Sequence, residues 1–279
     1  MKIGVNVWSL PGGWSLEKIF GVAKAAGFDG VEVALDETGE VGLELEKGGA
    51  EKIRELAGRA GIELYSVATG LYWKYSPTSA DPAVRSKAKA IIRKQLEIAS
   101  WLGCDTILVV PGAVGVDFVP GCEIVPYDTA YERAADAIGE TKGLAEQLGV
   151  NLGVENVWNK FLLSPLEMRD FIDRAGSARV GAYFDVGNTL LTGYPEHWIK
   201  ILGSRIKKVH FKDFRRSVGT LDGFVDMLSG DVNYPAVMGA FRDAGYDGWV
   251  TAEVSPCADY PEHGARSLAN AMRAIVAGG

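Results

Sequence analysis

Between residues 151 and 254, four short apolar segments each end on a polar residue. These segments read Leu152-Gly-Val-Glu155, Ala182-Tyr-Phe-Asp185, Lys208-Val-His210 and Thr251-Ala-Glu253. Each is rich in β-branched or aromatic residues, and a Gly, Pro, Ser or Asp-rich stretch and a helical pattern follow it. The stretch therefore predicts four consecutive βα units, with one metal-type ligand at the end of each strand.

Outward from this stretch, the same alternation continues through the chain. Strands are predicted at residues 3–9, 30–35, 64–68, 106–110, 151–155, 180–185, 207–211 and 249–254. Helices are predicted at residues 15–27, 50–60, 82–102, 128–148, 165–175, 195–202, 234–244 and 265–276. Alternating strands and helices imply a parallel sheet. Eight such units in 279 residues fit a single-domain (β/α)8 TIM barrel over residues 1–279, since about 250 residues is typical of that fold.

An open, doubly wound sheet is the alternative for this alternation. Its dinucleotide-binding fingerprint, Gly-x-Gly-x-x-Gly, is missing after the first predicted strand. Two long interruptions, residues 112–126 and residues 214–231, follow the fourth and seventh strands. Loops on that side of a barrel build the active site, so we interpret both segments as candidate lids.

Composition indicates a cytoplasmic protein with a large core. The hydrophobic fraction is 47% with a mean hydropathy near zero, and no apolar run approaches the roughly 20 residues of a membrane span. The chain starts directly on a strand, so we expect no signal peptide. Three widely spaced cysteines, Cys104, Cys122 and Cys257, are expected to be reduced and structural. A net charge of −7 disfavours a nucleic-acid surface.

Strand alternation places the four polar residues on one side of the sheet. In a barrel, alternate side chains point at the helices or at the axis. In the fifth strand, Leu152 and Val154 suit the helices, so Glu155 turns to the axis. The same alternation turns inward the polar ends of the next three strands, Asp185, His210 and Glu253.

Three carboxylates in one place repel each other unless a positive charge lies among them. A divalent cation meets this need, and three oxygen donors with one imidazole suit Mn²⁺, with Mg²⁺, Co²⁺ or Zn²⁺ as further options. The alternative is that these are separate buried polar residues, each paired with Arg or Lys. We expect His197 and His263, the other two histidines, at the surface.

At these residues the chain resembles the xylose isomerase-like TIM-barrel superfamily, in its sugar and sugar-phosphate isomerase/epimerase branch, which includes the D-tagatose and D-psicose 3-epimerases. The resemblance covers essentially the whole chain. The segments that carry it are Gly27-Phe-Asp-Gly-Val-Glu32, Val154-Glu-Asn156, Phe184-Asp-Val-Gly-Asn188, His210-Phe-Lys-Asp213 and Gly245-Tyr-Asp-Gly248. It implies that Glu155, Asp185, His210 and Glu253 ligate one metal, usually manganese, and that the two glutamates are also the catalytic acid and base.

The resemblance also implies a reaction and substrate contacts. The reaction would be proton transfer next to a ketose carbonyl through a metal-bound enediolate, with 3-epimerisation favoured over aldose–ketose isomerisation. Arg216 matches a family arginine, and Asn188 stands where the 3-epimerases usually carry a histidine. The loop at Trp158 also lacks a glutamate that they carry. Relatives are often dimers or tetramers, which implies a homo-oligomer.

Other residues are candidates by position. Lys212 shares the axial parity and could reach a substrate oxyanion or phosphate. Five aromatic residues could wall a sugar pocket: Trp8, Trp14, Tyr72, Trp73 and Trp158. Asn6 and Glu32 share the axial parity too, and a structural role fits them as well as a functional one. Lys208 has the same parity lower in the barrel.

Four other functions remain open from the sequence. A lyase of the same superfamily, similar to inosose or 3-dehydroshikimate dehydratases, would use the same metal. A DNA-repair AP endonuclease needs more histidines than the three present. A glycoside hydrolase uses two carboxylates on a barrel but has no need for His210 and Asp185 beside them. The fourth is a metal-free binding or regulatory protein.

Overall fold

Eight parallel strands close into a barrel in the computed structural model, which describes residues 1–278. Around the barrel the spatial order is β1 (Lys2–Asn6), β10 (Trp249–Ala252), β7 (Ile206–Phe211), β6 (Val180–Asp185), β5 (Asn151–Glu155), β4 (Thr106–Val109), β3 (Glu63–Thr69) and β2 (Gly30–Leu35). The single-domain TIM barrel predicted from the sequence is confirmed, and the open sheet is excluded.

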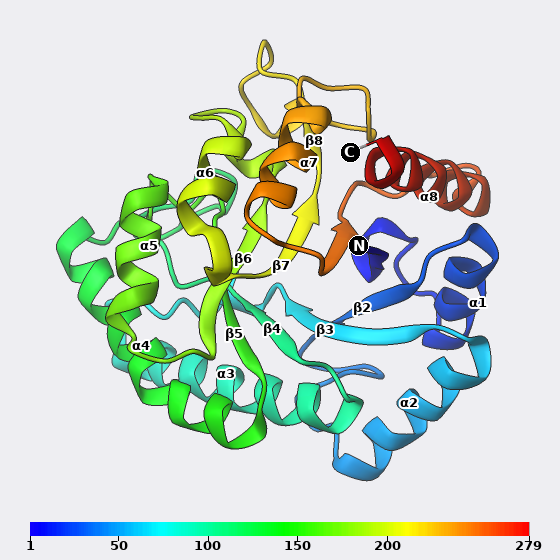
Figure 1. The fold of residues 1–279 in the computed structure, drawn as a ribbon. Helices are drawn as coiled ribbons and strands as arrows, with labels where there is room; N and C mark the ends of the chain where they lie inside the picture. The colour runs from blue at the N-terminus through cyan, green and yellow to red at the C-terminus, as the bar shows by residue number, and fades with distance from the viewer. Residues whose placement is uncertain (279) are drawn as a thin grey trace.

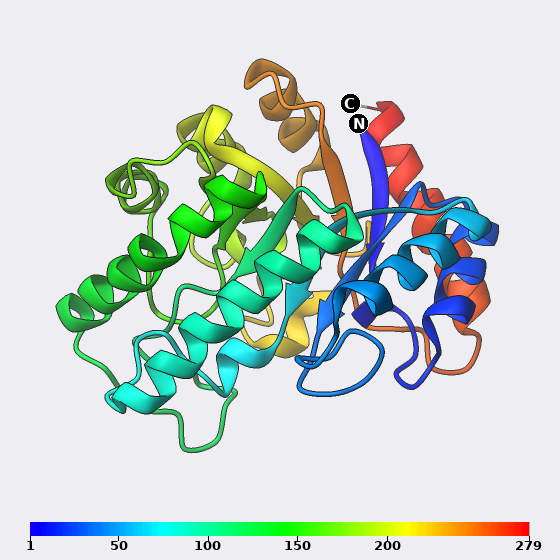
Figure 2. The same ribbon diagram turned by 90° about the horizontal axis from the view of Figure 1, so that it is seen from below.

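Helices surround the strands on the outside (Figure 1). They are α1 (Leu16–Ala26), α2 (Lys47–Ala60), α3 (Pro82–Leu102), α4 (Tyr127–Leu148), α5 (Pro165–Arg174), α6 (Pro195–Leu202), α7 (Tyr234–Asp243) and α8 (Pro261–Gly278). Loops from several βα units project at the lower edge of Figure 2, beyond the carboxyl ends of the strands. Among the described residues, no helix has both the length and the apolar character needed to cross a bilayer.

Local sequence signals set the helix ends. Ser15 caps α1 by accepting a hydrogen bond from Lys18 N at 3.3 Å, and Ser164 caps α5 from Glu167 N at 3.2 Å. Helices α1 to α4 end on glycines in the left-handed conformation, Gly27, Gly61, Gly103 and Gly149. Glycine adopts this conformation without steric penalty, so each helix stops there and the chain turns back to the sheet.

The main departure from the predicted elements is in the first strand. Residues Val7–Ser9 form a 3-10 helix rather than the end of a strand. The Asn6 side chain causes this change, because its Oδ1 accepts a hydrogen bond from Trp8 N at 2.8 Å and turns the chain. Helix α8 begins at Pro261, so His263 lies in its first turn instead of a loop. The expected exposure of His263 and His197 is confirmed.

The two sides of each strand carry different side chains. Outward-facing residues such as Val154, Phe184 and Val209 are fully buried in an aliphatic and aromatic core with the helices. The axial side is mostly polar or small, as at Asn6 and Thr251. Lower in the barrel, Lys208 is buried, in agreement with its axial parity, and its ammonium pairs with Asp105 at 2.6 Å, a partner that the parity did not predict.

The segment after β7 is folded rather than open. It contains a two-stranded antiparallel sheet of β8 (Asp213–Phe214) and β9 (Phe224–Val225). The buried Asp213 carboxylate accepts hydrogen bonds from the backbone N–H groups of Phe214, Gly230 and Val232 at 2.9 to 3.2 Å. This carboxylate therefore anchors both ends of the loop beside the carboxyl ends of β7 and β10.

Candidate metal centre

Four side chains converge at the carboxyl end of the barrel. One ligand atom from each of Glu155, Asp185, His210 and Glu253 lies within 4.8 Å of the others. Strand register explains this convergence, because Asp185 pairs with His210 across β6 and β7, and Thr251 pairs with His210 across β10 and β7. Glu253 follows the end of β10, where its N–H still bonds to Phe211 O at 3.0 Å.

The four strands are neighbours in the order β5, β6, β7, β10. Glu155 and Glu253 therefore lie at the two ends of the row, with Asp185 and His210 between them. The alternation of strand side chains predicts this axial set, and the structure brings all four together.

The contacts within the cluster leave several lone pairs without hydrogen bonds. His210 Nδ1 lies 2.5 Å from a Glu253 oxygen, 3.6 Å from Glu155 and 4.0 Å from Asp185. Among the described side chains, three buried atoms have no hydrogen bond of normal geometry: Asp185 Oδ2, His210 Nδ1 and Glu253 Oε2. Their close polar contacts are with one another and with the Lys212 ammonium. Buried polar atoms are rarely left unpaired in proteins. A divalent cation among them would bind all three, so the residues fit a metal ion.

Lys212 is the cation nearest to this cluster in the structure. Its Nζ lies 3.0 Å from Asp185 Oδ2 and 3.2 Å from Glu253 Oε1, and its side chain is mostly buried. The sequence placed Lys212 on the axis, and the structure confirms that position. The neighbouring Asp213 does not pair with Lys212, because its carboxylate accepts hydrogen bonds from backbone N–H groups.

Charge and burial have opposite effects on the pKa values of the two glutamates. Burial raises the pKa of Glu155 to about 7, although the neighbouring His210 imidazole and the charge of Lys212 act against it. Burial also raises the pKa of Glu253, but the charges of Lys212 and His210 outweigh burial and lower it to about 2. Two carboxyl groups of one site thus favour different protonation states near neutral pH.

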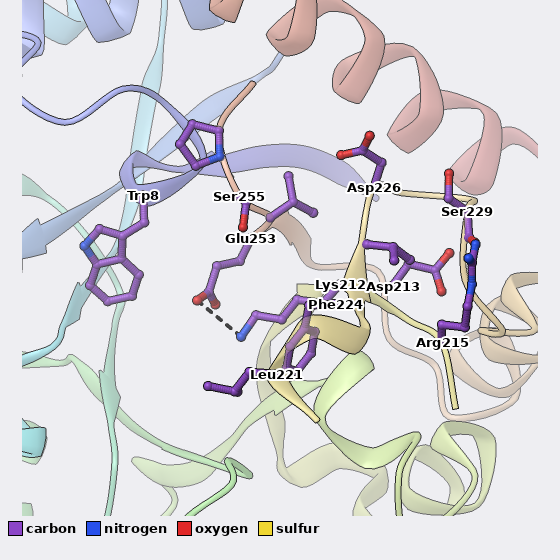
Figure 3. Close-up of a pocket in the computed structure, with 13 residues that line it drawn as sticks. Trp8, Lys212, Asp213, Arg215, Leu221, Phe224, Asp226, Ser229, Glu253 and Ser255 are labelled. Carbon is purple, nitrogen blue, oxygen red and sulfur yellow. Dashed lines mark hydrogen bonds and ion pairs between the residues drawn. The ribbon is translucent and has the colours of Figure 1, made fainter. Parts of the chain in front are cut away.

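Two cavities adjoin the cluster. The larger one, of about 690 Å³, has Lys212 and Glu253 at one end and reaches Arg215 and Ser229 at the other. Figure 3 shows the Lys212 and Glu253 side chains pointing toward one another, with Trp8 on the same side. A smaller cavity of about 160 Å³ touches both Glu155 and Glu253. Its aromatic wall is Trp8, Trp73, Phe118, Trp158 and Phe224.

Four of the predicted substrate contacts line the small cavity: Trp8, Trp158, Asn188 and Lys212. Asn188 also fixes the cluster, since its N–H donates to Asp185 Oδ1 at 2.8 Å. Trp158 in turn donates from Nε1 to Asn188 O at 3.0 Å.

Two other predicted contacts lie elsewhere. The Arg216 guanidinium lies 5.1 Å from the Tyr194 ring centroid, and its Nε donates to Leu190 O at 3.2 Å. Trp14 packs beneath the ammonium of Lys18, which is 4.1 Å from its ring centroid. Contact between Arg216 and a substrate at the cluster would require its side chain to leave Tyr194.

Sequence reasoning identified both long loops but missed the residues in them that matter. Phe118 from the loop after β4, and Leu221 and Phe224 from the loop after β7, reach the small cavity. Phe118 packs edge-on against Trp73, with ring centroids 5.2 Å apart. These residues could have been predicted as cavity-lining, because each is a large apolar residue within a loop at the carboxyl end of the barrel. The three cysteines are free, as expected, but only Cys104 is buried as a structural cysteine would be, because Cys257 is exposed.

Comparisons with known proteins agree with this geometry. A family model described as "Xylose isomerase-like TIM barrel" matches residues 20–275. A protein of Escherichia coli strain K12 named "Putative L-ribulose-5-phosphate 3-epimerase SgbU" is 26% identical over 242 residues, which are 81% of this chain and 79% of that protein. A 2-epi-5-epi-valiolone 7-phosphate 2-epimerase of an Actinoplanes species is 26% identical, over 76% of this chain and 72% of the relative.

Solved structures give the same fold. The crystal structure of a D-psicose 3-epimerase in the presence of D-fructose superposes with a TM-score of 0.82 at 22% identity. The superposition covers 100% of both chains.

Proposed function

This chain belongs to the family of xylose isomerase-like TIM barrels, and on that premise we propose that it is a metal-dependent isomerase of sugars or sugar phosphates. The favoured reaction is epimerisation of a ketose at carbon 3. Two similar proteins carry 3-epimerase names, one for L-ribulose 5-phosphate and one for D-psicose, which supports this choice. The ion proposed is Mn²⁺, with Mg²⁺, Co²⁺ or Zn²⁺ as alternatives.

The observation that carries the proposal is the position of the two glutamates. Glu155 and Glu253 lie at opposite ends of the row of four ligands, and both line the small cavity. A substrate in that cavity would have one carboxylate on each side. Inversion of a carbon centre needs this arrangement, because the proton leaves from one face and returns to the other.

Glu155, Asp185, His210 and Glu253 would hold the ion through three carboxylates and His210 Nδ1. When bound, a divalent cation would polarise the substrate carbonyl as a Lewis acid and make the neighbouring C–H more acidic. One glutamate then removes the proton from carbon 3, and the opposite glutamate donates a proton to the other face. The first glutamate ends protonated and the second ionised, so proton exchange with water restores both.

Other residues of the cavity orient the substrate. Lys212 would donate a hydrogen bond to the oxygen that gains negative charge as the proton leaves. Asn188 offers a polar contact at the floor, and Trp8 and Trp158 give apolar walls against which a sugar ring or carbon chain packs. The aromatic wall also excludes water, which strengthens every charged contact inside.

Three further properties belong to this proposal. The partner is a small-molecule sugar, without nucleic acid or membrane. The oligomer is a dimer or tetramer, which ultracentrifugation would test. The place of action is the cytoplasm, in carbohydrate metabolism, which cell fractionation would test.

The test combines metal analysis with deuterium exchange. The purified protein is stripped with a chelator, reloaded with Mn²⁺, and incubated in D₂O with a panel of free and phosphorylated ketoses and, separately, with a keto-cyclitol. We expect one divalent ion per chain, metal-dependent deuterium at carbon 3, and the inverted product. Deuterium at carbon 1 or an aldose product would indicate isomerisation, and an ultraviolet chromophore from a keto-cyclitol would indicate a dehydratase. No metal uptake would overturn the proposal.

A further inference from the structure

Beneath the four ligands lies a buried carboxylate that the proposed mechanism does not use. Glu32 extends from β2, across the barrel from β7, and has no exposed surface. Its Oε2 lies 2.6 Å from His210 Nε2, on the side of the imidazole ring opposite the cluster. One imidazole therefore joins the ligand cluster to this buried acid.

Four polar side chains surround Glu32. Oε2 accepts from Asn6 Nδ2 at 2.5 Å and lies 2.6 Å from His210 Nε2. Oε1 accepts from Ser66 Oγ at 2.7 Å and from the Tyr183 hydroxyl. An ionised carboxylate has about four lone-pair sites and only accepts hydrogen bonds. The surrounding groups therefore match an ionised Glu32 carboxylate. Because this carboxylate only accepts hydrogen bonds, the Asn6 amide nitrogen and the His210 Nε2 must both donate to it.

This arrangement assigns the proton of a neutral His210. Because Nε2 must donate to Glu32, the lone pair of the imidazole is on Nδ1, which faces Glu155, Asp185 and Glu253. The other tautomer would place a lone pair against the Glu32 carboxylate and an N–H against the ligand carboxylates. The ring then could not bind a cation through Nδ1.

We propose that Glu32 is a positioning residue that fixes the tautomer and ring orientation of His210 for metal binding. This inference rests on the metal site of the proposed function. A carboxylate that accepts the second N–H of a metal-binding imidazole also raises the basicity of the ring, and loss of such a partner typically weakens metal affinity about 10- to 100-fold.

The negative charge of Glu32 favours this positioning role over a purely structural one. Hydrogen bonds to Ser66, Tyr183 and Asn6 would be satisfied by a neutral acceptor, and ionising a buried carboxyl is costly. Among the groups that contact Glu32, His210 is the one that gains positive charge, either by protonation or by binding a metal cation. The ionised acid is therefore matched to the imidazole rather than to the hydroxyl groups.

The test compares variants of one buried network. Glu32→Gln removes the charge and keeps the size of the side chain. Glu32→Asp keeps the charge but moves the carboxylate away from His210, because the side chain is shorter. Tyr183→Phe and Ser66→Ala each remove one hydrogen-bond donor to the same carboxylate. Zn²⁺ affinity is measured by competition with a chromophoric chelator, and circular dichroism checks the fold. Nitrogen-15 NMR of the Zn²⁺-loaded protein reports which His210 nitrogen carries the proton, against the exposed His197 and His263.

We expect Glu32→Gln to bind Zn²⁺ about 10- to 100-fold more weakly. Glu32→Asp should be intermediate, and the two control variants should stay within about threefold of the parent. In the parent, His210 should carry its proton on Nε2, and in Glu32→Gln this signal should broaden or shift.

Three outcomes would overturn the inference: equal affinity and an unchanged His210 signal in Glu32→Gln, equal losses in Tyr183→Phe, or failure of both Glu32 variants to fold while the controls fold. If the parent itself takes up no Zn²⁺ or other divalent ion, the proposed function fails instead.

Discussion

The outer and inner faces of the barrel strands are equally buried and chemically opposite. On β6, Phe184 packs among the helices and Asp185, the next residue, joins the ligand cluster. On β7, Val209 and His210 make the same contrast. Burial of apolar surface stabilises the fold, at about 25 cal/mol per Å². Burial of charges costs free energy unless they are paired.

Residues that stabilise the fold and residues that form the candidate site are therefore direct neighbours along one strand. Apolar packing on the outer face stabilises the barrel. This stability allows the inner face to bury several carboxylates that repel one another. Substitutions on opposite faces of one strand should therefore have separable effects on stability and on activity.

The largest effect on activity is expected at Glu155 and Glu253, the two end residues of the four-residue cluster. Glu155→Gln and Glu253→Gln should each lower kcat by about 10²- to 10⁴-fold, because each removes an acid/base group. The measurement is turnover with metal content held equal. Glu63→Gln, an exposed residue at the opposite end of the barrel that pairs with Lys2, is the matched control. A near-normal rate in either axial variant would exclude the two-base mechanism.

The outer face should respond in stability. Phe184→Ala should lower the free energy of unfolding by about 3–5 kcal/mol, since it removes a fully buried ring that contacts Trp198 and Phe241. Urea unfolding of the metal-free protein measures this change. The folded variant should keep its metal affinity within about threefold. A large loss of metal affinity with little loss of stability would contradict the separation of the two faces.

Lys212 lies between the cluster and the larger cavity and should have a smaller effect. Lys212→Met should lower kcat/KM about 10- to 150-fold, the equivalent of one hydrogen bond to a charged group of about 1.5–3 kcal/mol. Lys160→Met is the control, because Lys160 makes an exposed ion pair with Asp117 at 2.6 Å and such pairs contribute about 0–1 kcal/mol. Similar losses in both variants would remove Lys212 from the mechanism.

The smallest effect is a pH dependence of the metal-free protein. Burial raises the folded-state pKa of Glu155 from 4.5 to about 7, so this group adds stability below pH 4.5 that is lost as the pH rises through 7. The contribution falls by at most about 1.4 kcal/mol per pH unit.

The lowered pKa of Glu253, about 2, acts in the opposite direction and only below pH 4.5. Urea titrations between pH 5 and 8 should show the slope in the parent and a smaller slope in Glu155→Gln. An equal slope in both would assign it to another group.

Much of the barrel was predictable because its signals are local. Strand alternation, capping residues and glycine helix ends depend on neighbours in sequence, and they gave the eight βα units and the inward orientation of Glu155, Asp185 and His210. The boundaries that were wrong had a different cause. The 3-10 turn after β1 depends on one side-chain hydrogen bond from Trp8 N to Asn6, which no periodicity reveals.

Residue type and strand parity were therefore sufficient to predict the fold class and to place the four side chains of the candidate metal centre on the barrel axis. Only the tertiary structure decided what those side chains meet there. It joined Glu32 to His210 and to Tyr183, 178 and 151 residues away along the chain, and it left Arg216 against Tyr194. The physical reason is that contacts across a closed barrel depend on the shear and register of all eight strands together, which no local pattern records.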